Sequence, residues 1–242
     1  MILAAGLGTR MAPLTDNMPK ALIPVRGRPL LGHVMDRLVA AGATRLIVNI
    51  ARHGEQVAEW LASNTPAGVE IALSPEPDGP YDTGGGLAAA AHLFKRDGPI
   101  ILHNVDILSR IPLDRLVAEH AAAKLRLGDK LVATLAVQAR ATNRRVLFDD
   151  IGLVGWGTEH AREPVGTERD LAFAGIHVVE RAVLDGAATR AAPTGGARTF
   201  PIKEVYLKLV TSGYIICPAD VSQYDWLDVG TPERLLDAEK FV

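Results

Sequence analysis

The strongest constraint on the fold is the alternation of short apolar runs with amphipathic segments over residues 1–138. The apolar runs have the length of buried strands. The segments between them place apolar residues at helical spacing, as Leu30, Val34 and Leu38 do. Such alternation predicts an α/β fold with a mainly parallel sheet flanked by helices on both faces. Strands are expected at 1–5, 45–51, 69–74, 99–106 and 131–138, and helices at 30–41, 55–62, 87–95 and 112–127.

The pattern changes after residue 140. Expected there are an antiparallel hairpin (145–150 with 152–157), a strand (171–179), a loop (189–199), a helix (202–213), two short strands in YIICPA and YDWLDVG, and a terminal helix with Thr231 as N-cap. We therefore expect a single domain, 1–242. Its α/β core covers 1–140, and a smaller mixed α+β lobe over 141–242 returns to that core.

The first strand leads directly into the loop GLGTRMAP. Open α/β sheets bind ligands beyond the carboxyl ends of their strands, and glycines let backbone N–H groups approach a phosphate. Three phosphate-loop patterns compete here. A dinucleotide fingerprint would need a small residue where Met11 stands, and a P-loop is absent. The third pattern is G-x-G-T-R-x-x-P-L-T followed by P-K.

Two cations belong to this third pattern, and a nucleoside triphosphate, with about four negative charges, needs such cations. Arg10 is a forked donor that suits the leaving β- and γ-phosphates. Lys20, in MPKAL, could bridge the α-phosphate and an incoming phosphate. Pro13 and Pro19 restrict the loop that holds both cations.

The blocks LAAGLGTRMAPLT and MPKALIPVRGRPL closely resemble the signature of the sugar-1-phosphate nucleotidyltransferases, the family that makes nucleotide sugars. The resemblance continues through DTGGG, the Asp of NVD and WLDVGTPERL, so it covers nearly the whole chain. It implies a Rossmann-like nucleotide-diphospho-sugar transferase fold with a sugar-binding lobe. It also implies an enzyme that transfers a nucleoside monophosphate from an NTP to a sugar 1-phosphate and releases pyrophosphate.

The resemblance implies a nucleotide site in the first loop and around DTGGG. Arg10 and Lys20 are expected to be catalytic. The glycines of DTGGG are expected at a helix N-terminus, where N–H groups are free to meet a ligand. Glu76 could accept a hydrogen bond from the base. The expected nucleotide-binding residues are Leu3, Ala4, Ala5, Gly6, Gly8, Thr9, Arg10, Glu76, Gly84 and Gly85.

Two aspartates are candidate Mg²⁺ ligands. Asp106 ends the apolar strand IILHNVD, where a carboxylate is costly without a partner, and Mg²⁺ on the triphosphate would be that partner. The resemblance makes Asp228, at the end of a second short strand, the other Mg²⁺ ligand. The nearby Asp225 competes for this role.

The sugar site is expected to include Asn104, Gly175 and Lys203. Gly175 lies in FAGIHV, which matches a family strand whose glycine lets the sugar approach, although a bulge would equally explain it. A better-characterised branch of the family places a Lys in an E-K-P motif, which this chain lacks. Lys203, near the start of a predicted helix, is the substitute considered.

Composition excludes several classes of partner. With 26 Lys+Arg against 28 Asp+Glu the net charge is −2, and no basic stripe occurs, so nucleic acid is not an expected partner. The longest apolar runs are strand-sized and the start lacks a signal peptide, so no membrane association is expected. The single cysteine, Cys217, excludes an intrachain disulfide and favours a cytoplasmic protein. A monomer or homodimer is expected.

Alternatives remain at the level of substrate and activity. A nucleotide-binding sensor or pseudoenzyme of the same fold is the main alternative, and Met11 disfavours a dinucleotide-dependent oxidoreductase. The compact length resembles enzymes acting on N-acetylmuramate 1-phosphate with UTP, and guanylyltransferases for mannose- or heptose-type phosphates. UTP is therefore slightly favoured, with GTP next. Family members usually carry a few residues before this start, and no appended acyltransferase domain is expected.

Overall fold

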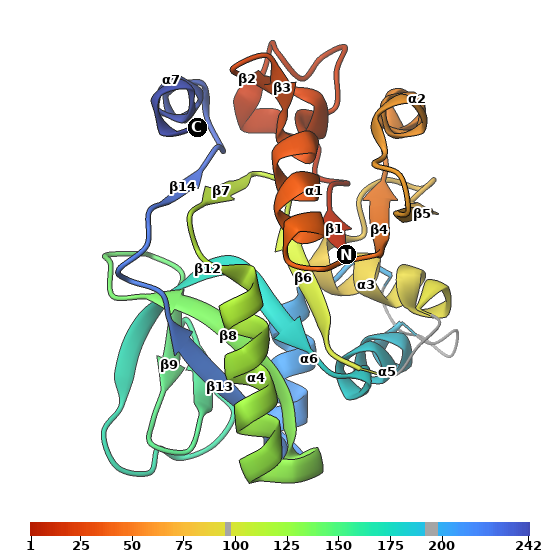
Figure 1. Cartoon of the computed structure of the whole chain (residues 1–242). Coiled ribbons are helices and arrows are strands. Elements are labelled where there is room, and N and C mark those ends of the chain that lie inside the picture. Colours follow the sequence, from red (N-terminus) through yellow and green to blue (C-terminus); the bar gives the residue numbers. More distant parts are fainter. Residues whose placement is uncertain (95–97, 192–197) are drawn as a thin grey trace.

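A computed structural model describes residues 1–94, 98–191 and 198–242. Its elements form three layers, with a central sheet between two groups of helices (Figure 1). The predicted α/β class is confirmed. In the described residues, no helix is both long and apolar enough to span a bilayer.

The parallel part of the sheet runs in the order β6 (Ile100–Asn104), β1 (Ile2–Leu3), β4 (Arg45–Ile50) and β5 (Glu70–Pro75). The long strand β12 (Arg169–Val179) joins the edge of β6 in the antiparallel sense and turns the sheet into its mixed part. That part contains β8 (Leu131–Gln138), β13 (Ile215–Asp220), β9 (Arg145–Phe148), β10 (Leu153–Trp156) and β11 (Glu159–His160).

Strand β8 joins the two parts of the chain. It precedes residue 140, yet it pairs antiparallel with β12 and parallel with β13, both of which follow that residue. The hairpin predicted from 145–150 and 152–157 is present as the antiparallel pair β9–β10. The division of the domain at residue 140 stays a prediction.

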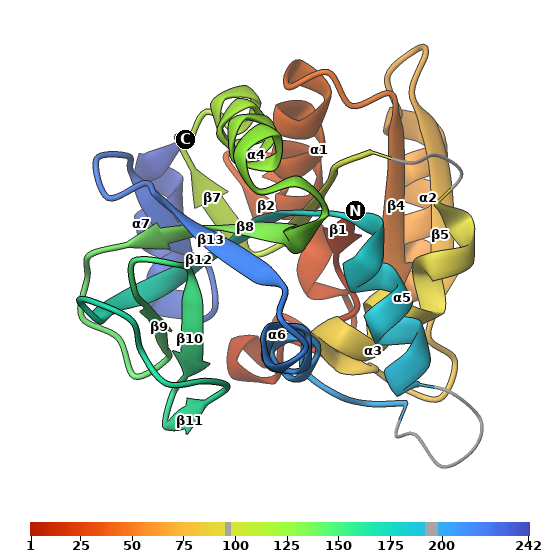
Figure 2. The same ribbon diagram turned by 90° about the horizontal axis from the view of Figure 1, so that it is seen from below.

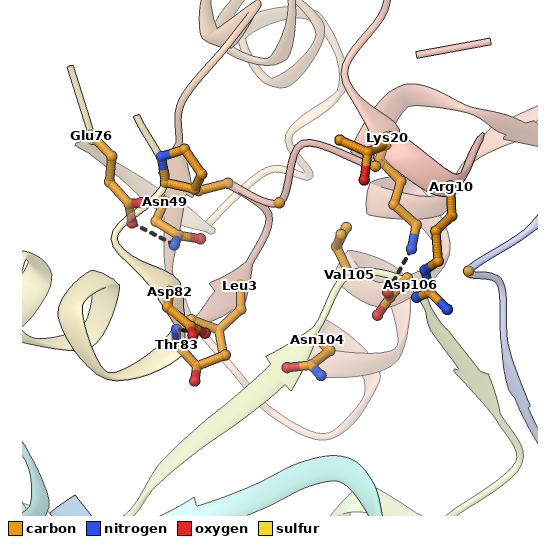
Figure 3. Close-up of a pocket in the computed structure, with 16 residues that line it drawn as sticks. Leu3, Arg10, Lys20, Asn49, Glu76, Asp82, Thr83, Asn104, Val105 and Asp106 are labelled. Carbon is orange, nitrogen blue, oxygen red and sulfur yellow. Dashed lines mark hydrogen bonds and ion pairs between the residues drawn. The ribbon is translucent and has the colours of Figure 1, made fainter. Parts of the chain in front are cut away.

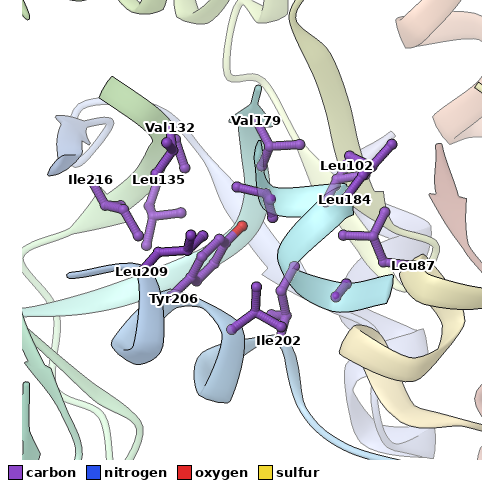
Figure 4. Packing of buried hydrophobic residues seen from close by; sticks show 14 of the residues in the cluster. Leu87, Leu102, Val132, Leu135, Val179, Leu184, Ile202, Tyr206, Leu209 and Ile216 are labelled. Atoms are coloured by element: carbon purple, nitrogen blue, oxygen red, sulfur yellow. The ribbon is translucent and has the colours of Figure 1, made fainter. Parts of the chain in front are cut away.

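Helices cover the sheet on both sides (Figure 2). The apolar faces of α1 (Leu30–Ala40), α2 (Gly54–Asn64) and α4 (Leu113–Leu127) pack in one cluster. Those of α3 (Asp82–Ala90), α5 (Arg181–Arg190) and α6 (Ile202–Thr211) pack in another. The two successive residues of β1 point to opposite faces of the sheet, as strand geometry requires. Ile2 joins the cluster of α1, α2 and α4, and Leu3 joins the cluster of α3, α5 and α6. In Figure 4, Tyr206 and Leu209 of α6 lie close to Leu135 of β8.

A third apolar cluster ties the two ends of the chain together. It joins Met11 of the first loop, Leu108 of β7 (Ile107–Ser109), Leu227 of β14 (Trp226–Asp228) and Ala238 of α7 (Pro232–Phe241). Helix α7 begins after its predicted cap, because the Thr231 side chain accepts the N–H of Arg234. The small sheet of β2 (Pro24–Val25) and β3 (Arg28–Pro29) lies at this end of the molecule.

Local predictions differ from the structure in several places. The helix expected at 87–95 already begins at Asp82, so DTGGG forms its first turns, and after α3 it continues as a 3₁₀ turn, η3 (Ala91–Leu93). Helix α5 was not predicted. The first strand is shorter than expected and ends at Leu3. Residues 192–197 of the loop expected at 189–199, and residue 95, lie outside the described residues.

Candidate active site

Three parallel strands deliver their carboxyl ends to one edge of the sheet. Leu3 of β1 pairs with Asn49 of β4 on one side and with Asn104 of β6 on the other. The residues that follow these positions open into a pocket of about 320 Å³ (Figure 3). Its lining consists of Leu3, Ala5, Gly6, Gly8, Thr9, Arg10, Lys20, Asn49, Glu76, Pro80, Asp82, Thr83, Asn104, Val105, Asp106 and Gly230.

The first loop is folded tightly against the pocket. Gly8 has a φ of 64°, which glycine adopts readily, and its carbonyl accepts a hydrogen bond from the Thr15 hydroxyl at 3.0 Å. A Cβ at Gly8 would lie 2.9 Å from a Thr15 methyl carbon and 3.0 Å from the Lys20 Cβ. The glycine therefore lets residues 8, 15 and 20 close on one another, which fixes Lys20 at the pocket wall.

Lys20 and Asp106 form the central ion pair of the pocket. Lys20 Nζ lies 2.6 Å from Asp106 Oδ2, and the lysine side chain is only 8% exposed. Arg10 reaches toward the same carboxylate in Figure 3, and it donates no hydrogen bond to any residue of the described part. The two predicted catalytic cations thus meet one predicted metal ligand.

Asp228 lies next to Asp106 because β14 pairs with β7. Asp228 is opposite Ile107, and the N–H of Val229 donates to the Asp106 carbonyl at 2.8 Å. Burial raises the pKa of Asp228, and the Asp106 carboxylate raises it further, whereas Lys20 and Arg10 lower it. Oδ1 of Asp228 is buried without a hydrogen-bond partner. An unpartnered carboxylate oxygen beside a second carboxylate is suited to a cation.

Asp225, the alternative to Asp228 as a metal ligand in the sequence analysis, does not line this pocket or the larger pocket described below. Its side chain is 72% exposed and lies 3.6 Å from Arg110. Gly230, which sequence reasoning missed, lines the pocket beside Arg10 and Asp228. A Cβ there would lie 2.8 Å from Arg10 Nη2 and 2.8 Å from Asp228 Oδ1.

Asn49 holds the opposite wall of the pocket, and sequence reasoning also missed it. Its Oδ1 accepts the N–H of Ala4 at 2.6 Å, and its Nδ2 donates to Glu76 Oε1 at 2.7 Å. The other oxygen of Glu76 accepts the N–H of Tyr81 at 2.6 Å. Glu76 lines the pocket, but both of its oxygens already have partners, so it braces the wall. A polar Asn inside the apolar run RLIVNIA was the signal in the sequence.

This network gives a prediction with a pH signature. Burial raises the pKa of Glu76, and the hydrogen bonds from Tyr81 and Asn49 lower it. Asn49→Asp would place a second carboxylate against it and should lower the free energy of unfolding by about 3 kcal/mol at neutral pH.

Glu76 and the introduced aspartate would both have raised pKa values in the folded state. An acid of this kind lowers the free energy of unfolding when the pH is above its folded-state pKa, and the loss is recovered as the pH falls. Chemical unfolding between about pH 8 and about pH 5 should show the variant gaining stability relative to the parent. Asn64→Asp, at the exposed end of α2, is the matched control. Equal pH profiles for the variant and the parent would contradict the network.

Gly84 and Gly85 are not brought into the pocket. Both N–H groups donate to the Phe200 carbonyl, at 3.0 and 3.1 Å, so the expectation of free N–H groups is wrong. The glycines are buried inside α3, where the backbone of residues 198–200 passes close to them. The residues of this helix that line the pocket are Asp82 and Thr83 instead. Ala4 does not line the pocket either, because its N–H is turned to Asn49.

Gly85 is the position where this close crossing should cost most. A Cβ there would lie 2.0 Å from the Arg198 carbonyl oxygen and 2.8 Å from the Tyr81 Cβ. Gly85→Ala should therefore lower the free energy of unfolding by about 2 kcal/mol or more, in spite of the better helix propensity of alanine.

Gly186→Ala in α5 is the control, because a Cβ there would lie 3.2 Å from a Val205 methyl carbon and 3.8 Å from the Leu209 methyl carbons, with no backbone atom among these nearest neighbours. Denaturant unfolding should show a change below about 1 kcal/mol for the control. Similar values for the two variants would show that the crossing is not tight.

A second, larger pocket of about 940 Å³ opens from the first. The two share Arg10, Asp82, Thr83, Asn104 and Gly230. All three predicted sugar residues line it, together with Asp228. The lining residues that sequence reasoning missed include Arg140, Thr142, Asn143, Arg144, Trp156, Phe173, Trp226 and Arg234.

The three predicted sugar residues differ in their surroundings. Gly175 has a φ of 74°, and a Cβ there would lie 3.0 Å from Asn104 Nδ2. It therefore leaves room for the Asn104 amide at the boundary between the pockets. Lys203 instead forms an ion pair with Glu159, 2.6 Å apart, so its charge is already balanced. The sugar-binding role of these residues stays a prediction.

Several characterised proteins are similar to this chain in sequence. The N-acetylmuramate α-1-phosphate uridylyltransferase of Neisseria meningitidis serogroup B is 46% identical over 111 residues, which are 46% of this chain and 48% of that protein. The corresponding enzyme of Caulobacter vibrioides is 29% identical over 252 residues, 99% of this chain and 94% of that protein. A mannose-1-phosphate guanyltransferase of Eremothecium gossypii is 29% identical and is matched over 62% of its length.

The fold is also that of known structures. A Bacillus anthracis protein assigned as a glucose-1-phosphate thymidylyltransferase superposes with a TM-score of 0.80 at 20% identity, over 99% of this chain and 93% of that one. At this identity the likeness shows the fold alone. The model of the nucleotidyl transferase family matches residues 1–242, so the chain belongs to that family.

Proposed function

We propose that the protein transfers a nucleoside monophosphate from an NTP to a sugar 1-phosphate, forming a nucleotide sugar and pyrophosphate. One observation carries this proposal: two cations and two carboxylates, Arg10, Lys20, Asp106 and Asp228, meet where two connected pockets join. The smaller pocket, at the glycine-rich loop, would take the nucleotide. The larger would take the sugar phosphate.

The chemistry needs charge neutralisation more than it needs a base. The attacking phosphate oxygen is already anionic, since the second pKa of a phosphate monoester is about 6. It attacks the α-phosphorus, the bond to the β-phosphate oxygen breaks, and pyrophosphate leaves with the electron pair. Lys20 and Arg10 reduce the repulsion between two anionic substrates and align them for this displacement.

The residues fit a divalent cation, and we propose Mg²⁺. The unpartnered Oδ1 of Asp228 and the carboxylate of Asp106 would hold it. No cluster of three or more His, Cys, Asp or Glu side chains with metal-site geometry occurs among the described residues. The remaining ligands would therefore be phosphate oxygens and water, as is usual for Mg²⁺ at nucleotides. When bound, the ion would supply positive charge at the phosphates.

We propose UTP as the nucleotide and N-acetylmuramate 1-phosphate as the sugar substrate, with GTP and mannose 1-phosphate next. The uridylyltransferase of Caulobacter vibrioides, which matches this chain over nearly the whole length of both proteins, supports the first pair. The guanyltransferase similarity supports the second.

The test is a matrix of NTPs against sugar 1-phosphates with Mg²⁺, read by pyrophosphate release. We expect release that requires both substrates and is fastest with UTP and N-acetylmuramate 1-phosphate. Nucleotide binding without pyrophosphate release for any pair would instead indicate a nucleotide-binding protein without turnover.

A further inference from the structure

Arg140 lies in the larger pocket and is held there by uncharged groups. Its Nε donates to Gln138 Oε1 at 3.2 Å, and its Nη2 donates to the Phe173 carbonyl at 3.4 Å. Its Cζ lies over the Trp226 ring, 4.1 Å from the ring centroid. The guanidinium is therefore positioned by hydrogen bonds and by stacking before any ligand is bound.

The groups that hold Arg140 are themselves fixed. The Trp226 indole donates its N–H to the Ala174 carbonyl at 2.7 Å. Gln138 is only 7% exposed, and its Nε2 donates to the Tyr224 carbonyl at 3.3 Å. The platform under the arginine thus comes from β8, β12 and β14 together, so the position of the guanidinium does not depend on one mobile loop.

Arg140 differs from the other stacked arginines in its lack of a counter-charge. Four arginines of the described residues lie over aromatic rings. Three of them also pair with a carboxylate: Arg28 with Asp36, Arg110 with Asp225, and Arg190 with Glu204. Arg140 forms no ion pair with any carboxylate in the part of the chain that the structure describes. A fixed cation without a partner is suited to an anionic ligand.

The position of Arg140 beside Asp228 indicates which anion it could bind. Trp226 and Asp228 are two residues apart on β14, so their side chains point to the same face of the strand. A guanidinium stacked on Trp226 therefore stands next to Asp228. Burial lowers the pKa of Arg140, the Asp228 carboxylate raises it, and the Arg234 guanidinium lowers it, so both of these charges lie near Arg140. Arg140 lines the larger pocket and not the smaller one at the glycine-rich loop.

We propose that Arg140 binds the phosphate group of the sugar 1-phosphate and holds it beside Asp228. This inference rests on the proposed function, which puts the nucleotide in the smaller pocket and the sugar phosphate in the larger. Nη1 of Arg140 donates to no described residue, and Nη2 has a second N–H, so one edge of the fork remains for phosphate oxygens. Arg140 is thus a substrate-binding residue that aligns the attacking phosphate.

Equilibrium binding tests this without turnover. The protein is saturated with Mg²⁺ and a UTP analogue in which the bond between the α- and β-phosphates resists cleavage. N-acetylmuramate 1-phosphate is then titrated by calorimetry. We expect Arg140→Ala to weaken binding of the sugar phosphate on the order of 10- to 100-fold, the worth of a charge-assisted hydrogen-bonded pair. Affinity for the UTP analogue should change less than about 3-fold.

Two further variants separate charge from geometry. Arg140→Lys keeps the charge but loses the planar fork and the stacking, so its affinity should lie between those of the parent and of Arg140→Ala. Arg110→Ala removes a cation stacked on Phe241 at 5.9 Å, outside both pockets, and should bind the sugar phosphate like the parent.

The outcomes are distinguishable from those of the proposed function. Unchanged sugar-phosphate affinity in Arg140→Ala overturns the inference, whether or not the enzyme turns over. Equal weakening for the sugar phosphate and the UTP analogue also overturns it, because the effect is then not specific to the larger pocket. A parent protein that binds the analogue but no sugar phosphate overturns both the inference and the transferase proposal.

Discussion

Lys20→Ala is expected to lower kcat by roughly 100- to 1,000-fold, the scale of losing one preorganised electrostatic group. Lys20 is buried and lies 2.6 Å from Asp106, so its charge is fixed at the junction of the two pockets. The loss should be seen mainly in kcat, because the charge acts where two anionic substrates are brought together. Steady-state pyrophosphate release, with both substrates varied, measures it.

Lys208→Ala is the control for Lys20. Lys208 is an exposed lysine of α6 that lines neither pocket, so kcat should stay within about 2-fold of the parent. Circular dichroism establishes whether Lys20→Ala is folded. A folded Lys20→Ala protein with near-normal kcat would contradict the role assigned to this lysine.

Asp228→Asn is expected to lower activity by about 100-fold or more and at the same time to raise the Tm of the metal-free protein. Burial and the Asp106 carboxylate raise the pKa of Asp228, so its charge is unfavourable in the folded state without a cation. The amide removes that charge and with it a metal ligand. Titration of Mg²⁺ against activity, and thermal unfolding with and without Mg²⁺, test the two parts of the prediction.

Asp225→Asn is the matched control, since Asp225 lies three residues away and pairs with Arg110 at the surface. It should keep activity and the stabilisation by Mg²⁺. Asp106→Asn should lose activity as Asp228→Asn does, but without the gain in Tm, because it leaves Lys20 without its partner. If metal-free Asp228→Asn has a lower Tm than the parent, the charge of Asp228 does not destabilise the metal-free fold and the prediction is wrong.

Some of the predicted site residues lie close to the ends of strands, and the structure brings them together. Arg10 lies in the loop after β1 and Asp106 lies just after β6, and parallel strands collect their carboxyl ends at one edge. The 2.6 Å contact between Lys20 and Asp106 also needs the glycine-rich turn, which lets Lys20 close on residues 8 and 15. Asp228 reaches the same edge because β14 pairs with β7. The family resemblance named Asp228 but did not predict this pairing.

The glycines of DTGGG show what local sequence cannot supply. Three consecutive glycines are typical of a turn, yet they lie inside α3. The backbone at residues 198–200 passes too close to Gly84 and Gly85 for side chains there, and a Cβ at Gly86 would meet Glu76 and Asn49. The partner of Gly84 and Gly85, the Phe200 carbonyl, is more than a hundred residues away in the chain. Tertiary packing therefore overrides the local preference.

The larger pocket was the least predictable part for the same reason. Local sequence does not single out these residues, since Gln138 ends β8, Arg140 follows it and Trp226 begins β14. These three residues come together only because β8 pairs with β12 and not with one of the parallel strands β6, β1, β4 and β5. Strand order and direction are properties of the whole sheet, so periodicity alone assigned β8 a strand but not its neighbours.

Phosphorus NMR of the reaction mixture tests the central claim most directly, because it identifies which bond breaks. With UTP, N-acetylmuramate 1-phosphate and Mg²⁺, the account predicts that the signals of UTP and of the sugar phosphate decline together. A pair of coupled diphosphate signals and the single signal of pyrophosphate should appear in equal amounts. Inorganic phosphate with unchanged sugar phosphate, or an unchanged spectrum for every NTP and sugar 1-phosphate, would contradict it.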